Sequence, residues 1–166
     1  MTSLVPLVRA PLAVKFTKTL VQMVCGRREA VPSRDVELSV LSHPDMQDML
    51  ALAALTHPGP FQPHTYQFGT FLGVRVDGML VAMGGQRMHL PGYRELSAIC
   101  THPDFRGRGY ARLIVSRLVA AVFDEGLTPF LHVEADNLGA QALYSTLGFV
   151  ERARLPLVVV ERMSSP

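Results

Sequence analysis

The sequence predicts an α/β fold, a single domain with a mixed, mostly antiparallel β-sheet of about seven strands flanked by helices. Apolar residues make up 48% of the 166-residue chain and charged residues 18%, which is the composition of a globular protein. Strand-like runs follow one another in the middle of the chain, and strand-like and helical periods alternate towards its end. That order of elements predicts a sheet packed against helices.

Residues 1–34 are predicted to be a basic arm or helix, and residues 35–166 the domain itself. Four apolar residues of the first segment recur at near-helical spacing: Leu12, Phe16, Leu20 and Met23. The segment holds six basic residues and one acidic residue, as a targeting presequence would, but it lacks a clear small-residue cleavage site. A helix or arm packed on the domain is therefore favoured over a targeting signal.

From Val36 the elements become regular, and turn residues separate them. Strands are expected over 36–41, 70–76, 79–88, 94–101, 130–134, 149–152 and 156–162. Helices are expected over 45–56, 109–125 and 138–147. Asp77-Gly78 is a strong hairpin signal, and the prolines of His57-Pro58-Gly59-Pro60 stop the first helix. Gly126 and Gly148 end the other two helices.

Two glycines and two arginines precede the helix at 109–125, in the run Arg106-Gly107-Arg108-Gly109-Tyr110-Ala111. Glycine lets the backbone approach an anion closely, and the first N–H groups of a helix lack partners at its positive end. The run therefore predicts a phosphate site. A dinucleotide-binding fingerprint is disfavoured, because it needs glycine at position 112, where this chain has arginine. A P-loop is excluded, because no Gly-Lys-Ser/Thr closes the run. An ordinary glycine-rich turn with solvated arginines is the remaining alternative.

The stretch Ile99–Ala111 closely resembles the coenzyme A-binding motif of the GNAT N-acetyltransferase superfamily, Arg/Gln-x-x-Gly-x-Gly/Ala, through Arg106, Gly109 and Ala111. Asn137 and the run Ala142–Phe149, which contains Tyr144, match the second signature of the family. The resemblance covers roughly residues 36–163. It implies the acyl-CoA N-acyltransferase fold and acetyl-CoA as the cofactor, released as coenzyme A.

The resemblance also implies how the cofactor is held. The backbone of Ile99, Cys100 and Thr101 would pair with the pantetheine arm as with an added strand. N–H groups between Gly107 and Arg112 would hold the pyrophosphate, and Asn137 and Tyr144 would flank the thiol. The full set of expected cofactor contacts is Ile99, Cys100, Thr101, Arg106, Gly107, Arg108, Gly109, Tyr110, Ala111, Arg112, Asn137 and Tyr144.

Transfer to an amine requires a base, because an alkyl ammonium with a pKa of about 10.4 is almost wholly protonated at pH 7. Glu95 is one candidate, four residues before Ile99 on the same strand, where several superfamily members carry a catalytic glutamate. His132 is the other, at a position that is glutamate in some relatives. A solvated carboxylate and a core histidine are the structural alternatives.

Tyr144 is expected to protonate the departing thiolate, and a backbone N–H of the Ile99–Thr101 strand to stabilise the oxyanion. Cys100 suggests a covalent acyl-cysteine route, but a small buried strand residue is the favoured interpretation, with direct transfer. The six histidines show no His-x-x-x-His pair and the two cysteines no ligand spacing, so no metal is expected.

The predicted function is therefore acetyl transfer to a primary amine of a small molecule, amino acid or peptide, in the cytoplasm. The acceptor pocket is expected from 60–68 and 88–94. Outside residues 1–34, ten basic residues face thirteen acidic ones, so no nucleic-acid partner is expected. No apolar run reaches the roughly 18 residues of a membrane-spanning helix, so no membrane partner is expected either, and a homodimer is left open. The alternatives are a catalytically silent acyl-CoA sensor and, less favoured, a dinucleotide-binding oxidoreductase.

Overall fold

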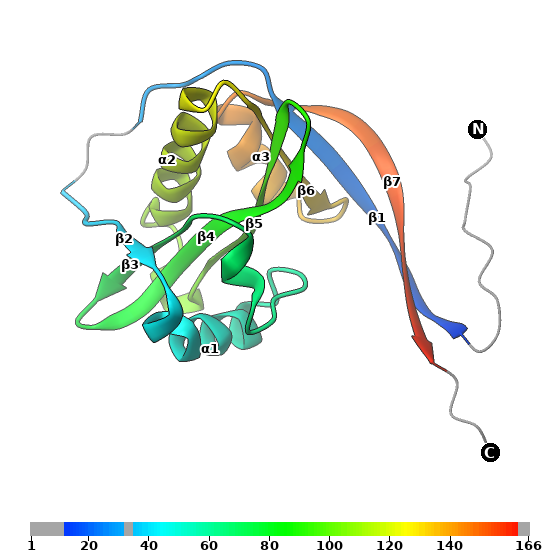
Figure 1. Ribbon diagram of the computed structural model, residues 1–166, viewed down its shortest axis with the longest axis horizontal. Coiled ribbons are helices and arrows are strands. Elements are labelled where there is room, and N and C mark those ends of the chain that lie inside the picture. The colour runs from blue at the N-terminus through cyan, green and yellow to red at the C-terminus, as the bar shows by residue number, and fades with distance from the viewer. Residues whose placement is uncertain (1–11, 32–34, 163–166) are drawn as a thin grey trace.

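The computed structural model of the protein describes residues 12–31 and 35–162, and these build one seven-stranded sheet in the order β2-β3-β4-β5-β6-β1-β7 (Figure 1). The strands are β1 (Leu12–Cys25), β2 (Ser39–Leu41), β3 (Phe71–Val76), β4 (Met79–Leu90), β5 (Tyr93–Thr101), β6 (Thr128–Glu134) and β7 (Phe149–Arg162). Neighbouring strands are antiparallel except β5 and β6, which are parallel. The predicted mixed, mostly antiparallel sheet with flanking helices is confirmed.

The prediction of a helix that includes Leu12 is wrong. That segment is the strand β1, which lies between β6 and β7. From Leu20 to Cys25 the side chains alternate between partly buried and buried, with a period of two. Of the apolar residues that suggested a helix, Leu12 and Phe16 are exposed and only Met23 is buried. Strand pairing thus overrides a coincidental spacing, and Leu12–Cys25 belongs to the main sheet.

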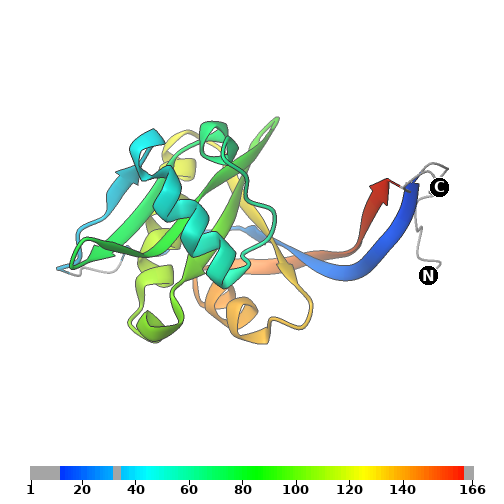
Figure 2. The same ribbon diagram turned by 90° about the horizontal axis from the view of Figure 1, so that it is seen from below.

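The two terminal strands expected at 149–152 and 156–162 form the single strand β7. Pro156 lies within it and pairs with Thr19 of β1. A proline is tolerated there because β7 is the edge strand, where a missing N–H breaks no ladder. The outer halves of β1 and β7 continue together as a two-stranded ribbon away from the body of the protein (Figures 1 and 2).

Helices cover the two faces of the sheet, α1 (Met46–Thr56) on one and α2 (Tyr110–Asp124) and α3 (Leu138–Thr146) on the other (Figure 2). Met49 and Leu52 of α1 belong to a buried cluster with Phe71. Ile114 and Leu118 of α2 belong to a separate cluster, which also includes side chains of β1, β6 and α3. We call these the α1 face and the α2–α3 face of the sheet.

The sheet divides between its two parallel strands. β5 and β6 are paired from Tyr93 and Thr128 up to Leu96 and Leu131. Beyond that point β5 stays paired with β4, and β6 stays paired with β1. Ala98 lies just past the division with a φ of +53°, at a shift of register that marks a β-bulge. The bulge and the division together create an unpaired edge on the last residues of β5.

Candidate active site

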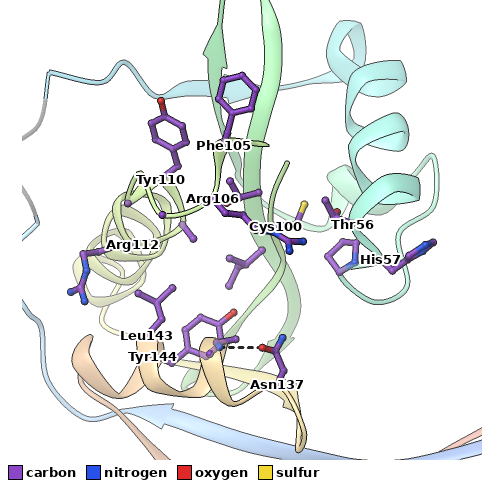
Figure 3. A pocket seen from close by; sticks show the side chains of 18 residues that line it. Thr56, His57, Cys100, Phe105, Arg106, Tyr110, Arg112, Asn137, Leu143 and Tyr144 are labelled. Atoms are coloured by element: carbon purple, nitrogen blue, oxygen red, sulfur yellow. Dashed lines mark hydrogen bonds between the residues drawn. The ribbon is translucent and has the colours of Figure 1, made fainter. Parts of the chain in front are cut away.

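A pocket of about 750 Å³ lies at the division between β5 and β6 (Figure 3). Its walls come from the end of α1, the end of β5, the loop into α2, and α3. The lining residues are Thr56, His57, Pro58, Ile99, Cys100, Thr101, Phe105, Arg106, Gly107, Gly109, Tyr110, Ala111, Arg112, Asn137, Gly139, Ala140, Leu143 and Tyr144. Eleven of the twelve expected cofactor contacts are therefore brought together on one pocket.

The glycine run forms a cradle at the N-terminus of α2. Gly107 and Gly109 have φ values of +74° and +80°, which only glycine adopts without strain. Gly109 caps the helix without a side-chain hydrogen bond, and the first intrahelical bond runs from the N–H of Leu113 to its carbonyl. The N–H groups of the residues between them are the donors that a helix leaves unpaired. A Cβ on Gly107 would meet no protein atom within 4 Å, so the cradle has room for an anion.

The end of β5 forms a second wall. On the side of β4, Cys100 pairs with Met83 and Thr101 with Ala82. On the other side β5 has left β6, and Ile99, Cys100 and Thr101 line the pocket there. An extended ligand lying along this edge would find backbone groups in the pattern of a strand.

The two arginines of the run and Arg112, which follows it, are placed differently. Arg106 lines the pocket, whereas Arg108 is absent from its lining. The guanidinium of Arg108 lies 4.7 Å from the centre of the Phe105 ring and donates to the Asp104 carbonyl at 3.4 Å. Arg112 lines the pocket and donates to Thr146 Oγ1 at 2.6 Å, which ties α2 to the end of α3.

Asn137 is at the N-terminus of α3. Its Oδ1 accepts a hydrogen bond from the N–H of Ala140 at 3.1 Å, so it caps the helix while it lines the pocket (Figure 3). The cap satisfies one of the N–H groups that a helix start leaves unpaired. The sequence resemblance predicted a contact with the thiol end of the cofactor and missed this structural role.

Tyr144 and Cys100 face the same cavity from different walls, and the Tyr144 ring points into it from α3 (Figure 3). Both side chains are buried, with exposures of 7% and 8%. Burial, followed by the charge that Cys100 carries once it ionises at high pH, raises the pKa of Tyr144 to about 12. Burial also raises the pKa of Cys100 to about 11, so this thiol stays protonated near neutral pH.

Glu95 and His132 contact one another but neither lines the pocket. His132 Nδ1 lies 2.9 Å from Glu95 Oε1, and Arg87 donates to both oxygens of Glu95 at 2.9 Å. The Glu95 side chain is 1% exposed. Burial alone would raise its pKa, but the hydrogen bonds and charges of His132 and Arg87 outweigh burial and lower the pKa.

Several lining residues were not anticipated from the sequence. Thr56, His57 and Pro58 form the wall at the end of α1, where the sequence indicated only the stop of a helix. His57 is a non-glycine residue with a φ of +49°, at the end of α1. The segments 60–68 and 88–94, which were expected to form the acceptor pocket, contribute nothing to the lining of this pocket.

Known proteins share this architecture. The FR47-like protein family matches residues 71–156, which include β5, the cradle and α3. A structure assigned to the GNAT family of acetyltransferases, from Novosphingobium aromaticivorans, is 36% identical and covers 93% of this chain and 69% of that chain, with a TM-score of 0.85.

Two relatives are N-acetyltransferases by name. The N-alpha-acetyltransferase MAK3 of Arabidopsis thaliana is 31% identical over 108 residues, which are 58% of this chain and 56% of that protein. The [ribosomal protein bS18]-alanine N-acetyltransferase of Salmonella typhimurium is 30% identical over 121 residues, which are 69% of this chain and 80% of that enzyme. The chain thus spans little more than half the length of MAK3.

The divided sheet and the helix-terminal cradle beside the division define an acyl-CoA N-acyltransferase fold. The family match and the similarity to the Salmonella enzyme identify the group more closely. This chain belongs to the GNAT superfamily of N-acetyltransferases.

Proposed function

We propose that this protein transfers an acetyl group from acetyl-CoA to an amine by direct attack within a ternary complex. One observation carries the proposal, namely that the cradle of α2 and the unpaired end of β5 open into a single pocket. The N–H groups at 110–112 suit a pyrophosphate, and the β5 edge suits the amide groups of a pantetheine arm. Acetyl-CoA would supply the activated thioester.

Tyr144 is the proposed proton donor to the departing thiolate. A pKa of about 12 keeps the phenol protonated until it is needed. A thiolate in open water would be too weak a base for such a phenol, but burial in the pocket would raise the pKa of the departing thiol as well. Cys100 in the same pocket is an example, since burial raises its pKa to about 11. Because the raised pKa keeps the Cys100 thiol protonated, Cys100 is a poor nucleophile, which favours direct transfer over an acyl-cysteine route.

The proton acceptor is proposed to come from the Glu95–His132 pair, and the oxyanion donor from a backbone N–H of residues 99–101. Leu131 and Val133 belong to the cluster of the α2–α3 face, so His132, between them on β6, points to the α1 face. Tyr144 belongs to the α2–α3 side. The proposed acid and base would then act from opposite faces of the sheet, at the same division.

The acceptor is proposed to be the α-amine of a peptide or protein. MAK3 is an N-alpha-acetyltransferase, and the Salmonella enzyme acetylates an alanine of ribosomal protein bS18. On the α1 face, helix α1 lies over β4 and β5, whereas His132 lies on β6 and Gln22 on β1. We propose that an extended chain approaches the division over these strands. A small-molecule amine is the alternative outcome of the test.

The deciding experiment follows thiol release from acetyl-CoA with a panel of peptides that differ in the first residue, beside free amino acids and small amines. Calorimetric titration with acetyl-CoA runs in parallel. Release with peptides, and not with the same peptides acetylated in advance, supports the proposal. Tight binding without release on any amine would identify a silent acyl-CoA sensor, and absence of binding would refute both functions.

Two expectations on assembly and location stay predictions. No helix among the described residues is long and apolar enough to cross a membrane. Fractionation of cells that produce the full chain would test the cytoplasmic location. Sedimentation of the purified chain would test the homodimer.

A further inference from the structure

A chain of hydrogen bonds crosses five strands on the α1 face of the sheet. Arg87 of β4 donates to Glu95 of β5, and Glu95 contacts His132 of β6. His132 Nε2 lies 3.0 Å from Gln22 Nε2 of β1, and Arg152 of β7 donates to Gln22 Oε1 at 2.6 Å. The chain runs from one cation to another through a single buried carboxylate.

The direction of every bond in this chain is fixed by its members. Arg152 can only donate, so it holds the oxygen of the Gln22 amide and turns the amide NH₂ towards His132. Ionised Glu95 can only accept, so His132 Nδ1 must carry the hydrogen between them. The neutral imidazole is therefore held with its lone pair on Nε2, where the Gln22 NH₂ donates to it.

Glu95 is poorly suited to take a proton itself. Its two oxygens already accept bonds from Arg87 and His132, and these bonds lower its pKa despite its burial. A carboxylate with a lowered pKa is a weak base near neutral pH. The basic site of the pair is thus the Nε2 lone pair of the imidazole, which in the free protein contacts only the neutral Gln22 amide.

His132 also has the better position for the reaction. It directly follows Leu131, the last residue of β6 that pairs with β5, so it lies where β6 begins to separate from β5. Its side chain is 14% exposed, whereas that of Glu95 is 1% exposed. An amine that approaches over the α1 face meets the imidazole edge before it meets the carboxylate.

Resting on the proposed function, we propose that His132 Nε2 takes the proton of the acceptor amine, and that Glu95 is a positioning residue that fixes the reactive tautomer. The N–H bond of the acceptor breaks, its electron pair stays on nitrogen, and an N–H bond forms at Nε2. The donor of the bound amine replaces the NH₂ of Gln22, which holds that place in the free protein.

The charged groups around His132 determine the expected pH dependence. Glu95 faces it from β5 with Arg87 behind, and Arg152 stands behind Gln22 on β7. Glu134, two residues further along β6, is paired with Lys18. Removing the anion at Glu95 disfavours the imidazolium, whereas placing an anion at Gln22 favours it.

The test measures kcat against pH for Glu95→Gln and Gln22→Glu. The acid limb of the profile is the range in which kcat falls as the pH is lowered. It should move to lower pH in E95Q and to higher pH in Q22E. His132→Ala should lower kcat by about 100-fold or more, and added imidazole should restore part of it. Glu151→Gln, which removes an exposed carboxylate paired with Arg154, is the matched control and should leave the limb in place.

Nitrogen-15 spectra of the histidine rings in the protein without acetyl-CoA give a readout independent of turnover. They should show His132 as the Nδ1–H tautomer at high pH, and the Nε2–H tautomer there would overturn the inference. Loss of the acid limb of the kcat–pH profile in E95Q, together with a wild-type kcat in H132A, would also overturn the inference, since Glu95 would then be the base. A wild-type protein that acetylates no amine fails the proposed function, whereas turnover independent of His132 fails this inference alone.

Discussion

Leu96 of β5 and Leu131 of β6 are the last paired residues of the parallel junction, and every proposed catalytic group lies within reach of the gap that opens beyond them. β5 continues into the cradle that precedes α2, and β6 continues to His132 and the cap of α3. One break in a sheet therefore supplies a place for the donor arm, an acid on one face and a base on the other. Those positions give rise to the predictions below.

Tyr144→Phe should lower kcat by about 100-fold or more, because it removes a proton donor to the leaving thiolate and keeps the buried ring. The ring packs against Phe149 at 5.9 Å between centres, a contact that Phe would preserve. Thiol release measures kcat, and calorimetry should show nearly unchanged acetyl-CoA affinity. A collapse of affinity with unchanged kcat would make Tyr144 a packing residue.

Gly107→Ala should weaken acetyl-CoA binding, because a Cβ would project into the space of the cradle and a φ of +74° strains alanine by about 1 kcal/mol or more. Gly78→Ala is a matched control. Gly78 has a φ of +82° and no protein atom near its missing Cβ, but it lies in the β3–β4 turn away from the pocket.

Both variants should lose a similar amount of free energy of unfolding in urea, and only G107A should bind acetyl-CoA less tightly by calorimetry. Equal affinities in the two variants would show that the cradle does not hold the cofactor.

Asn137→Ala should lower the free energy of unfolding by about 1 kcal/mol, because it removes the acceptor that caps α3. Asn137→Asp keeps an oxygen at the same place and should retain the stability. Urea denaturation separates the two. If N137A instead keeps its stability and loses affinity for acetyl-CoA, Asn137 acts through the cofactor, as the family resemblance alone suggests.

Local patterns predicted the elements that surround the site. The turn at Asp77-Gly78, the amphipathic period of α2 and the glycine that ends it are all encoded within a few residues. The cradle was predictable for the same reason, since Gly107 and Gly109 must satisfy a local backbone geometry. Most of the pocket therefore follows from short-range signals.

The features that could not be predicted from the sequence depend on contacts between residues that are distant in the chain. β1 owes its place to pairing with β6 and β7, more than a hundred residues away, so its apolar spacing misled. Glu95 was indistinguishable from a solvated carboxylate because Arg87 and His132 reach it only across strands. The wall at Thr56 and His57 likewise arises from the packing of α1 on β4 and β5.

The lowered pKa of Glu95 predicts how stability depends on pH. A carboxyl group with a depressed pKa in the folded protein stabilises it fully above its ordinary value of 4.5, and this contribution disappears as pH falls through the folded pKa. Wild type should therefore lose its stability advantage over Glu95→Gln as the pH is lowered below about 4.5, because protonated Glu95 no longer pairs with Arg87 as an anion.

Thermal unfolding at a series of pH values measures the difference in Tm between wild type and E95Q. The difference should be constant at neutral pH and shrink in acid. Glu151→Gln, at the exposed pair with Arg154, should give a much smaller difference from wild type at neutral pH, because an exposed ion pair contributes little. A wild-type curve that stays parallel to that of E95Q down to low pH would show that Glu95 is not held as a buried anion, and the tautomer of His132 would then lose the acceptor that fixes it.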